Sequence, residues 1–260
     1  MSSRLPDLPA AFLGAPIAHR GLHDRAAGII ENSRTAALAA IDAGYGIELD
    51  VQASMDGEAM VFHDDAMQRL PGLPGLIRDH SAAALAATAL AGGTETIATL
   101  AEFLALVAGR VPLLVEVKDQ DGMLGPDVGP LEARVAALLA DYPGPVALMS
   151  FNPHSVAALA EAAPGIARGL TSCDFERENL SLPDYRVAEL SNLADFDRVG
   201  ATFISHHHRD LAHPAVTRLR ASGMPLLCWT IRSPAEEESA RRVAVNVTFE
   251  GYRPEGNLGR

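Results

Sequence analysis

Short apolar runs alternate with alanine-rich stretches of helical length along almost the whole chain. The runs have the length of buried strands, and the stretches that follow them have the length and composition of helices. Repeated strand–helix alternation over 260 residues favours a (β/α)8 TIM-type barrel over a doubly wound sheet. The expected strands cover 16–21, 46–51, 59–64, 111–118, 146–151, 166–171, 201–205, 225–231 and 245–249. The expected helices cover 33–44, 99–109, 130–141, 154–162, 187–199, 213–222 and 234–243.

This pattern gives one more candidate strand than an eight-stranded barrel needs. Asp56-Gly57 is a strong hairpin-turn signal, and a tight turn there would place Asp50 roughly opposite His63. A parallel arrangement would bring His63 to the same place, because it ends its strand. Either the hairpin arm at 59–63 or the last run at 245–249 lies outside the closed set, and the pattern does not decide which. We expect one barrel domain over residues 1–260, with an insertion at about 68–96 that carries a short helix.

Alternation within the strand at 46–51 places two carboxylates on one face. The Cα atoms of Glu48 and Asp50 lie roughly 6.6 Å apart if the segment is extended, and two charges held so close repel each other. A divalent cation would relieve this repulsion, and hard oxygen ligands favour Mg²⁺, Ca²⁺ or Mn²⁺ over zinc. The alternative is an ordinary strand with one face in water. Glu116 and Lys118 likewise share a face, either at a site or as a simple ion pair.

Polar side chains stand at many of the predicted strand ends. In a (β/α)8 barrel the carboxyl ends of the strands meet at one mouth, where the chemistry of such barrels takes place. This convergence predicts a single polar site, and it carries more weight than any one motif. The side chains concerned are His19, Arg20, Glu48, Asp50, His63, Asp64, Glu116, Lys118, Ser150, His206 and Trp229.

Charge and composition narrow the range of partners. The formal net charge of −12 argues against binding nucleic acid or an anionic membrane, although it permits a small anionic substrate in a locally cationic cleft. Two cysteines, Cys173 and Cys228, form no disulfide framework and are expected to be reduced. The sequence has no signal-peptide pattern and no apolar run long enough to span a membrane, so we expect a cytoplasmic protein. The oligomeric state stays open.

A set of short motifs occurs in an order that resembles the glycerophosphodiester phosphodiesterase family. The resemblance extends from residue 17 to about residue 254. Each motif alone is weak evidence, whereas eight in order with the right spacing are specific. The motifs are Ala18-His19-Arg20-Gly21, Glu31-Asn32-Ser33, Glu48-Leu49-Asp50-Val51, Met55-Asp56-Gly57, Val61-Phe62-His63-Asp64, Glu116-Val117-Lys118, Ser150-Phe151 and Trp229-Thr230.

The resemblance implies a barrel enzyme with a divalent metal and two catalytic histidines. It assigns the metal to Glu48, Asp50 and Glu116, and general acid–base catalysis to His19 and His63. Imidazole titrates near neutral pH, so two histidines can hold opposite protonation states at one pH. Four further residues are expected to bind substrate: Arg20 and Lys118 at the phosphate, Trp229 as a wall against the alcohol, and Glu31 nearby. One residue of the 206–208 histidine run, His206 or His208, is expected to reach the pocket.

The chain also departs from the family pattern. Ile30 replaces a proline and Ser33 a threonine, while Arg69 is followed by Leu70-Pro71 instead of two threonines. Phe249-Glu250-Gly251-Tyr252-Arg253-Pro254 replaces the terminal Thr-Asp-x-Pro motif. These changes affect substrate fit and barrel closure more than the expected metal and histidine residues.

The predicted reaction is metal-dependent hydrolysis of a glycerophosphodiester to glycerol phosphate and an alcohol. One histidine activates the attacking oxygen, from water or from a substrate hydroxyl, and the other protonates the leaving alcohol; the sequence does not distinguish their roles. One alternative is a phospholipase-type enzyme acting on lysolipid or sphingolipid head groups, with an apolar rim from Leu70, Leu73, Leu76 and Ile77. Another is a barrel that binds a phosphorylated ligand without catalysis.

Overall fold

Eight parallel strands close into a barrel in the computed structural model, which describes residues 5–90, 94–120, 122–176 and 182–255. Each strand is hydrogen-bonded to the next, and β1 pairs with both β2 and β10, which closes the ring. This confirms the predicted (β/α)8 fold. The barrel strands are β1 (Ile17–Ala18), β2 (Gly46–Ala53), β5 (Leu113–Val117), β6 (Val146–Ser150), β7 (Ala167–Ser172), β8 (Phe203–His207), β9 (Leu226–Ile231) and β10 (Asn246–Phe249).

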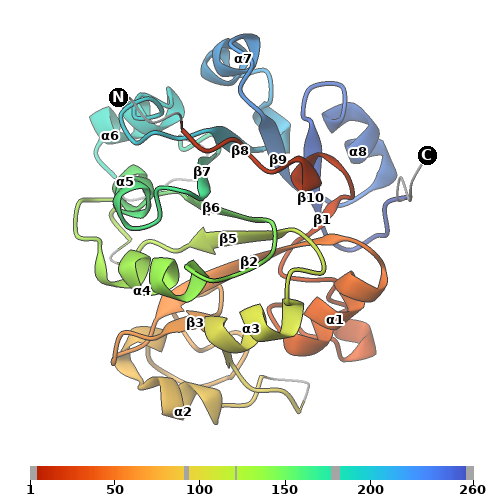
Figure 1. Ribbon diagram of the computed structural model, residues 1–260, viewed down its shortest axis with the longest axis vertical. Helices are drawn as coiled ribbons and strands as arrows, with labels where there is room; N and C mark the ends of the chain where they lie inside the picture. Colours follow the sequence, from red (N-terminus) through yellow and green to blue (C-terminus); the bar gives the residue numbers. More distant parts are fainter. Residues whose placement is uncertain (1–4, 91–93, 121, 177–181, 256–260) are drawn as a thin grey trace.

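Helices surround the strands, as Figure 1 shows. They begin at caps that the sequence supplies: the Ser33 hydroxyl accepts from the Ala36 backbone N–H, and Thr99 and Glu102 form a capping box. The helix expected at 187–199 ends at Ser191, and Leu193 follows with a positive φ of 52°. The outer helices are α1 (Arg34–Asp42), α3 (Leu100–Val107), α4 (Pro130–Leu139), α5 (Pro153–Ala162), α6 (Asp184–Ser191), α7 (Pro214–Ala221) and α8 (Pro234–Ala240).

The extra candidate strand is the hairpin arm. β3 (Ala59–Val61) runs antiparallel to β2 outside the closed ring and pairs on its other side with β4 (Ala98–Thr99), whereas the last run forms β10 and closes the barrel. Val51 lies opposite Val61, and the Phe62 backbone N–H donates to the Asp50 carbonyl at 3.0 Å. Phe62 therefore lies opposite Asp50, and His63, which was predicted to lie roughly opposite Asp50, is displaced by one residue. The turn has three residues instead of two, with Gly57 at φ 81°.

The segment between β3 and β4 forms a small apolar core of its own. It contains a 3-10 turn, η3 (Ile77–Asp79), and the expected short helix, α2 (Ala82–Ala86), at the lower edge of Figure 1. Leu70 and Ile77 are buried in that core, so the apolar rim predicted from 70–77 is wrong for these two side chains. Residues 91–93 of the expected insertion lie outside the described residues, and the single-domain division over residues 1–260 stays a prediction.

Side-chain alternation divides each barrel strand between an outer and an inner face. On β2, Ile47, Leu49 and Val51 belong to the core between strands and helices, which leaves Glu48 and Asp50 on the inner face. The lower part of the interior is apolar and is closed by Leu8 and by Phe12 of the 3-10 turn η1 (Ala10–Leu13). The residues that fill it are Ile17, Leu114, Ala147, Met149, Ala167, Phe203 and Leu227.

Glycine makes room for one of these side chains. A Cβ atom at Gly169 would lie 2.4 Å from the Phe203 ring, so only glycine allows this ring to fill the barrel beside β7. Among the described residues, no helix is both long enough and apolar enough to cross a lipid bilayer.

Candidate active site at the carboxyl ends of the strands

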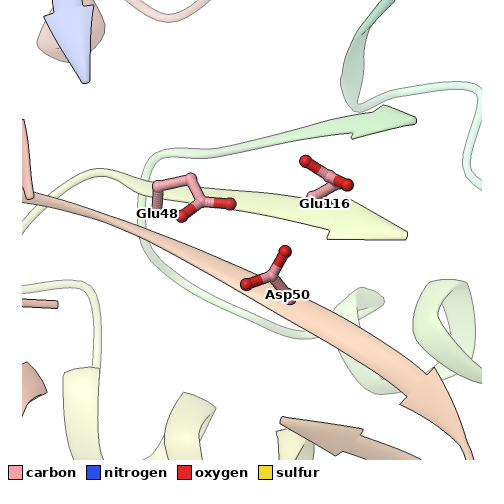
Figure 2. A group of neighbouring side chains, drawn as sticks. All are labelled: Glu48, Asp50 and Glu116. Carbon is pink, nitrogen blue, oxygen red and sulfur yellow. The ribbon is translucent and has the colours of Figure 1, made fainter. Parts of the chain in front are cut away.

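Three acidic side chains meet at the top of the barrel interior. Glu48 and Asp50 on β2 and Glu116 on β5 point toward one another in Figure 2, and one oxygen from each lies within 4.8 Å of the others. Asp50 and Glu116 are direct partners in the β2–β5 register. All three residues are buried, with relative exposures of 1%, 1% and 7%. The sequence pattern thus predicted a grouping that the fold brings about.

The three carboxylates of the triad affect one another's ionisation. Burial, together with the neighbouring charges of Asp50 and Glu116, raises the pKa of Glu48 well above its ordinary value. Burial also acts to raise the pKa of Asp50, but Lys118, His63 and Arg20 outweigh it and hold that pKa below its usual range. Hard carboxylate oxygens gathered this closely suit a divalent cation, which would relieve the repulsion at Glu48.

Two cations border the triad. The Lys118 ammonium donates to Glu116 Oε1 at 2.7 Å and lies 3.5 Å from Asp50 Oδ1. Burial acts to lower the pKa of Lys118, but the charges of Glu116 and Asp50 raise it overall, so the ammonium stays protonated. The Arg20 backbone N–H donates to Glu48 Oε2 at 3.0 Å, and its Nε lies 3.3 Å from Asp50 Oδ2.

A tight turn after β1 places Arg20. Arg20 has a φ of 57°, and Gly21 follows at 78°, where a Cβ atom would lie 2.8 Å from the Ala36 backbone of α1. Glycine is therefore required for the turn to pack against the helix. Asn32 joins this turn to the triad: its backbone N–H donates to the Arg20 carbonyl at 2.8 Å, and its side-chain amide donates to Asp50 Oδ2 at 3.0 Å.

His19 follows β1 and is held by a carboxylate. Its Nδ1 donates to Glu250 Oε2 at 2.6 Å, and its Nε2 lies 3.9 Å from Glu48 Oε2. Burial lowers the pKa of His19, although the Glu250 carboxylate acts in the opposite direction. Glu250 directly follows β10 and also accepts from Arg232 Nε at 2.8 Å. In the sequence, Glu250 is distinguished only as part of a departure from the family pattern.

His63 also lines the inner cavity and is likewise held by a carboxylate. Its Nδ1 donates to Asp64 Oδ1 at 2.7 Å. Burial acts to raise the pKa of Asp64, but hydrogen bonds from His63 and Arg69 hold it below its usual range, so Asp64 is an ionised acceptor. In both histidines a carboxylate engages Nδ1, which leaves Nε2 as the ring nitrogen available to another molecule.

Two connected cavities give access to these groups. The inner one, of about 230 Å³, brings together eight of the ten predicted site residues. The outer one, of about 540 Å³, shares His63, Glu116, Lys118, Phe151 and Trp229 with it and adds the apolar side chains of Leu124 and Cys173. Residues of the inner cavity predicted from sequence are His19, Arg20, Glu48, Asp50, His63, Glu116, Lys118 and Trp229.

Trp229 and Phe151 form the wall between the cavities. Their ring centroids lie 5.5 Å apart at 82°, and the Trp229 indole N–H donates to the Ser205 carbonyl at 3.0 Å. This hydrogen bond fixes the indole, so one of its faces is available as a rigid apolar surface.

The structure places Glu31 and His206 differently from the other predicted site residues. Among the described residues, the lining of neither cavity includes them. Glu31 lies behind Arg20 and accepts from Arg20 and Arg69, whose charges lower its pKa to about 2 despite burial. His206 is buried, with Nδ1 2.8 Å from Ser172 Oγ, and burial lowers its pKa to about 4.

Comparisons with known proteins identify the family of this chain. Residues 19–249 match the model of the glycerophosphoryl diester phosphodiesterase family. A glycerophosphodiester phosphodiesterase from Caldanaerobacter subterraneus subsp. tengcongensis is 31% identical over 166 residues, which cover 59% of this chain and 65% of that protein.

Solved structures show the same fold. An Oleispira antarctica phosphodiesterase in complex with the product sn-glycerol-3-phosphate is 23% identical, with a TM-score of 0.72 and coverage of 95% of this chain and 93% of that one. A glycerophosphodiester phosphodiesterase from Parabacteroides distasonis is 22% identical, with a TM-score of 0.70 and coverage of 94% and 93%. Because the family match covers most of its length, the chain belongs to the glycerophosphoryl diester phosphodiesterase family and is a phosphoric diester hydrolase.

Proposed function

We propose that this protein hydrolyses glycerophosphodiesters to glycerol phosphate and an alcohol, with a divalent metal and with His19 and His63 as the acid–base pair. The observation that carries the proposal is the inner cavity, where three buried carboxylates, two imidazoles and the cationic side chains of Arg20, Lys118 and Arg232 meet. The product held by the Oleispira antarctica relative supports a glycerol phosphate product.

Glu48, Asp50 and Glu116 would hold the metal. Their oxygen donors suit Mg²⁺, Ca²⁺ or Mn²⁺, and the unfavourable ionisation of Glu48 is the feature that a bound cation would correct. A divalent ion at this position supplies positive charge against the phosphate oxygens and favours deprotonation of an attacking hydroxyl.

The two histidines would move the protons. Glu250 and Asp64 hold each Nδ1, so each Nε2 is positioned to accept or donate a proton at the substrate. One imidazole takes the proton of the attacking oxygen, which belongs to water or to a substrate hydroxyl. The other gives a proton to the leaving alcohol oxygen as its bond to phosphorus breaks. Which histidine does which is open.

Arg20 and Lys118 would bind the phosphate oxygens. The guanidinium offers a planar pair of donors and the ammonium a point charge, and both line the inner cavity. Trp229 would lie against the leaving alcohol, which extends toward the outer cavity. Glu31 would act through Arg20 and not by direct contact, and the buried position of His206 gives no support to its predicted contact with substrate.

Metal reconstitution tests this proposal. Metal-free protein is incubated with a panel of glycerophosphodiesters, Mg²⁺, Mn²⁺ or Ca²⁺ is restored singly, and released glycerol phosphate is assayed. We expect release only after a cation is added. Equal release in the presence of a chelator would contradict the metal requirement, and absence of release with every substrate and metal would contradict the proposed activity.

A second candidate substrate class is favoured by the outer cavity. Its apolar wall contains Leu124, Phe151, Cys173 and Trp229 and could accommodate a larger apolar group, such as that of a lysolipid. Turnover of glycerophosphocholine and lysophosphatidylcholine at equal concentration separates the two classes. We expect glycerophosphocholine to be the better substrate.

A further inference from the structure

Arg69 makes two forked contacts at the rim of the site. Its Nε and Nη2 donate to the Asp64 carboxylate at 2.6 and 3.0 Å, and its Nη1 and Nη2 donate to the Glu31 carboxylate at 2.8 and 2.8 Å. One guanidinium therefore holds two carboxylates, each through both of its oxygens. Such paired bonds fix orientation as well as distance.

Each of these carboxylates in turn holds a residue of the inner cavity. Asp64 Oδ1 accepts from His63 Nδ1 at 2.7 Å, and Glu31 Oε1 accepts from Arg20 Nη1 at 2.6 Å. These are the same two oxygens that accept from Arg69 Nη2. A continuous chain of hydrogen bonds thus runs from His63 through Asp64, Arg69 and Glu31 to Arg20.

The charges along this chain alternate in sign. The side chain of Arg69 is 42% exposed, whereas those of Asp64 and Glu31 are 21% and 14% exposed, so Arg69 is its outermost member. Its guanidinium joins the two carboxylates, each of which has one further partner in the inner cavity, His63 for Asp64 and Arg20 for Glu31. Arg69 comes from the segment between β3 and β4, outside the barrel, so this segment reaches into the site through one side chain.

We infer that Arg69 is a positioning residue that sets the His63 imidazole and the Arg20 guanidinium in one arrangement, acting through Asp64 and Glu31. The inference rests on the proposed roles of His63 and Arg20. Four donors in a plane are a property of arginine, and lysine supplies the charge without the fork. The arrangement therefore depends on the shape of the side chain and not on its charge alone.

Kinetics of two Arg69 variants test this role. For both R69K and R69Q we expect kcat/KM to fall about 10–100-fold, the usual effect of removing an outer partner of a site residue, with the two variants within about threefold of each other. Misplacement of the His63 imidazole lowers kcat, and misplacement of the Arg20 guanidinium raises KM, so both constants are expected to change. Full activity in R69K with a defect in R69Q would overturn the inference, and so would activity within twofold of wild type in R69Q.

A matched control is available on the surface. Arg134 also holds a carboxylate with two donors, at 2.9 and 2.8 Å from Glu58, and its side chain is 39% exposed. Neither residue lines the described cavities. R134K and R134Q are expected to keep kcat/KM within twofold of wild type, and an equal loss in these controls would overturn the inference by showing a general effect of losing a surface ion pair.

The tautomer of His63 gives a readout that does not depend on turnover. Since Asp64 accepts from Nδ1, the neutral ring carries its proton on Nδ1 in the wild type, which side-chain ¹⁵N NMR detects. We expect a larger Nε2–H fraction in R69Q, and in R69K if R69Q does not fold. An unchanged tautomer overturns the inference whatever the activity. If the tautomer changes in R69Q but the wild-type protein cleaves no glycerophosphodiester, the inference is supported and the proposed function is contradicted.

Discussion

The lower and upper halves of the barrel interior are built from the same strands, but the side chains that fill them differ in polarity and charge. On β5, Leu114 faces the interior beside Phe203 and Leu227, and two residues further along the same face Glu116 joins two other carboxylates. The lower half is packed with apolar side chains, while the upper half holds charges that repel one another. A shift of two residues along a strand separates a region that stabilises the fold from one that is fitted for chemistry.

This difference shows how the barrel can hold an unfavourable site. The apolar lower interior and the core between strands and helices fix the backbone, so the carboxylates cannot move apart to relieve the repulsion. Burial, together with the neighbouring charges of Asp50 and Glu116, raises the pKa of Glu48 at this site. We therefore expect that substitutions in the upper half change activity and that substitutions in the lower half change stability, each largely without the other.

The largest effect is expected at the triad. Glu48→Gln removes a charge but keeps an oxygen that can accept the Arg20 N–H, so we expect kcat/KM to fall about 10³-fold, as when a group that stabilises transition-state charge is lost. The free energy of unfolding of the metal-free variant should not decrease, because repulsion is removed. Released glycerol phosphate and urea unfolding measure the two quantities. A variant that is both inactive and strongly destabilised would contradict the separation of the two halves.

Loss of either histidine is expected to have an effect of similar size. His19→Ala and His63→Ala should each lower kcat by about 10²–10⁴-fold if the residue transfers a proton in the transition state. Steady-state kinetics at saturating substrate measures this. Near-wild-type kcat in both variants would exclude the proposed acid–base pair.

A substitution in the apolar lower half should lower stability and leave activity nearly unchanged, the reverse of the effect expected at the triad. Leu114→Ala leaves a cavity in the apolar interior, and such changes cost about 2–5 kcal/mol of unfolding free energy. The activity of the protein that remains folded is expected to stay within about threefold of wild type, about 0.7 kcal/mol. Urea unfolding and kinetics at a temperature below the transition check both values. A large loss of kcat/KM in the folded variant would show that packing below the triad positions the carboxylates.

The smallest effect concerns pH. Burial lowers the pKa of His206 from 6.5 to about 4, so between these pH values the unfolded chain binds more protons than the folded protein. Stability due to the neutral ring is complete above about pH 6.5 and decreases as the pH falls toward 4, by about 2 kcal/mol between pH 7 and pH 5. The variant His206→Gln should show a flatter dependence in urea unfolding. Equal slopes in both proteins would exclude His206 as a source of acid sensitivity.

Local patterns in the sequence identified the strands and the residues at their ends. Alternation placed Glu48 and Asp50 on one face, and the barrel rule brought Glu116 to them, because both depend only on strand geometry. The hairpin arm was ambiguous because an Asp-Gly pair fits two-residue and three-residue turns, and the register differs by one residue between them. That single residue decides whether Phe62 or His63 lies opposite Asp50.

The partners of the site residues were harder to predict. Glu250 contacts His19 across 231 positions and Arg69 contacts Glu31 across 38, and no periodicity connects residues so far apart. The position of Glu250 directly after the last strand was the one available signal. His206 also lies near the carboxyl end of a strand, but its side chain is buried against Ser172, its direct partner in the register of β7 and β8.

The closure of the ring by β1 has a consequence for when the protein can work. His19 stands at the end of the first strand and its carboxylate partner Glu250 at the end of the last, and these strands meet only when β10 docks beside β1. A chain that has been synthesised, or is truncated, at a point between His63 and β10 would contain both histidines yet leave His19 without Glu250. The site would then become complete in a single late step, when the first and last strands of the barrel pair. The onset of activity during synthesis or refolding would report that step directly.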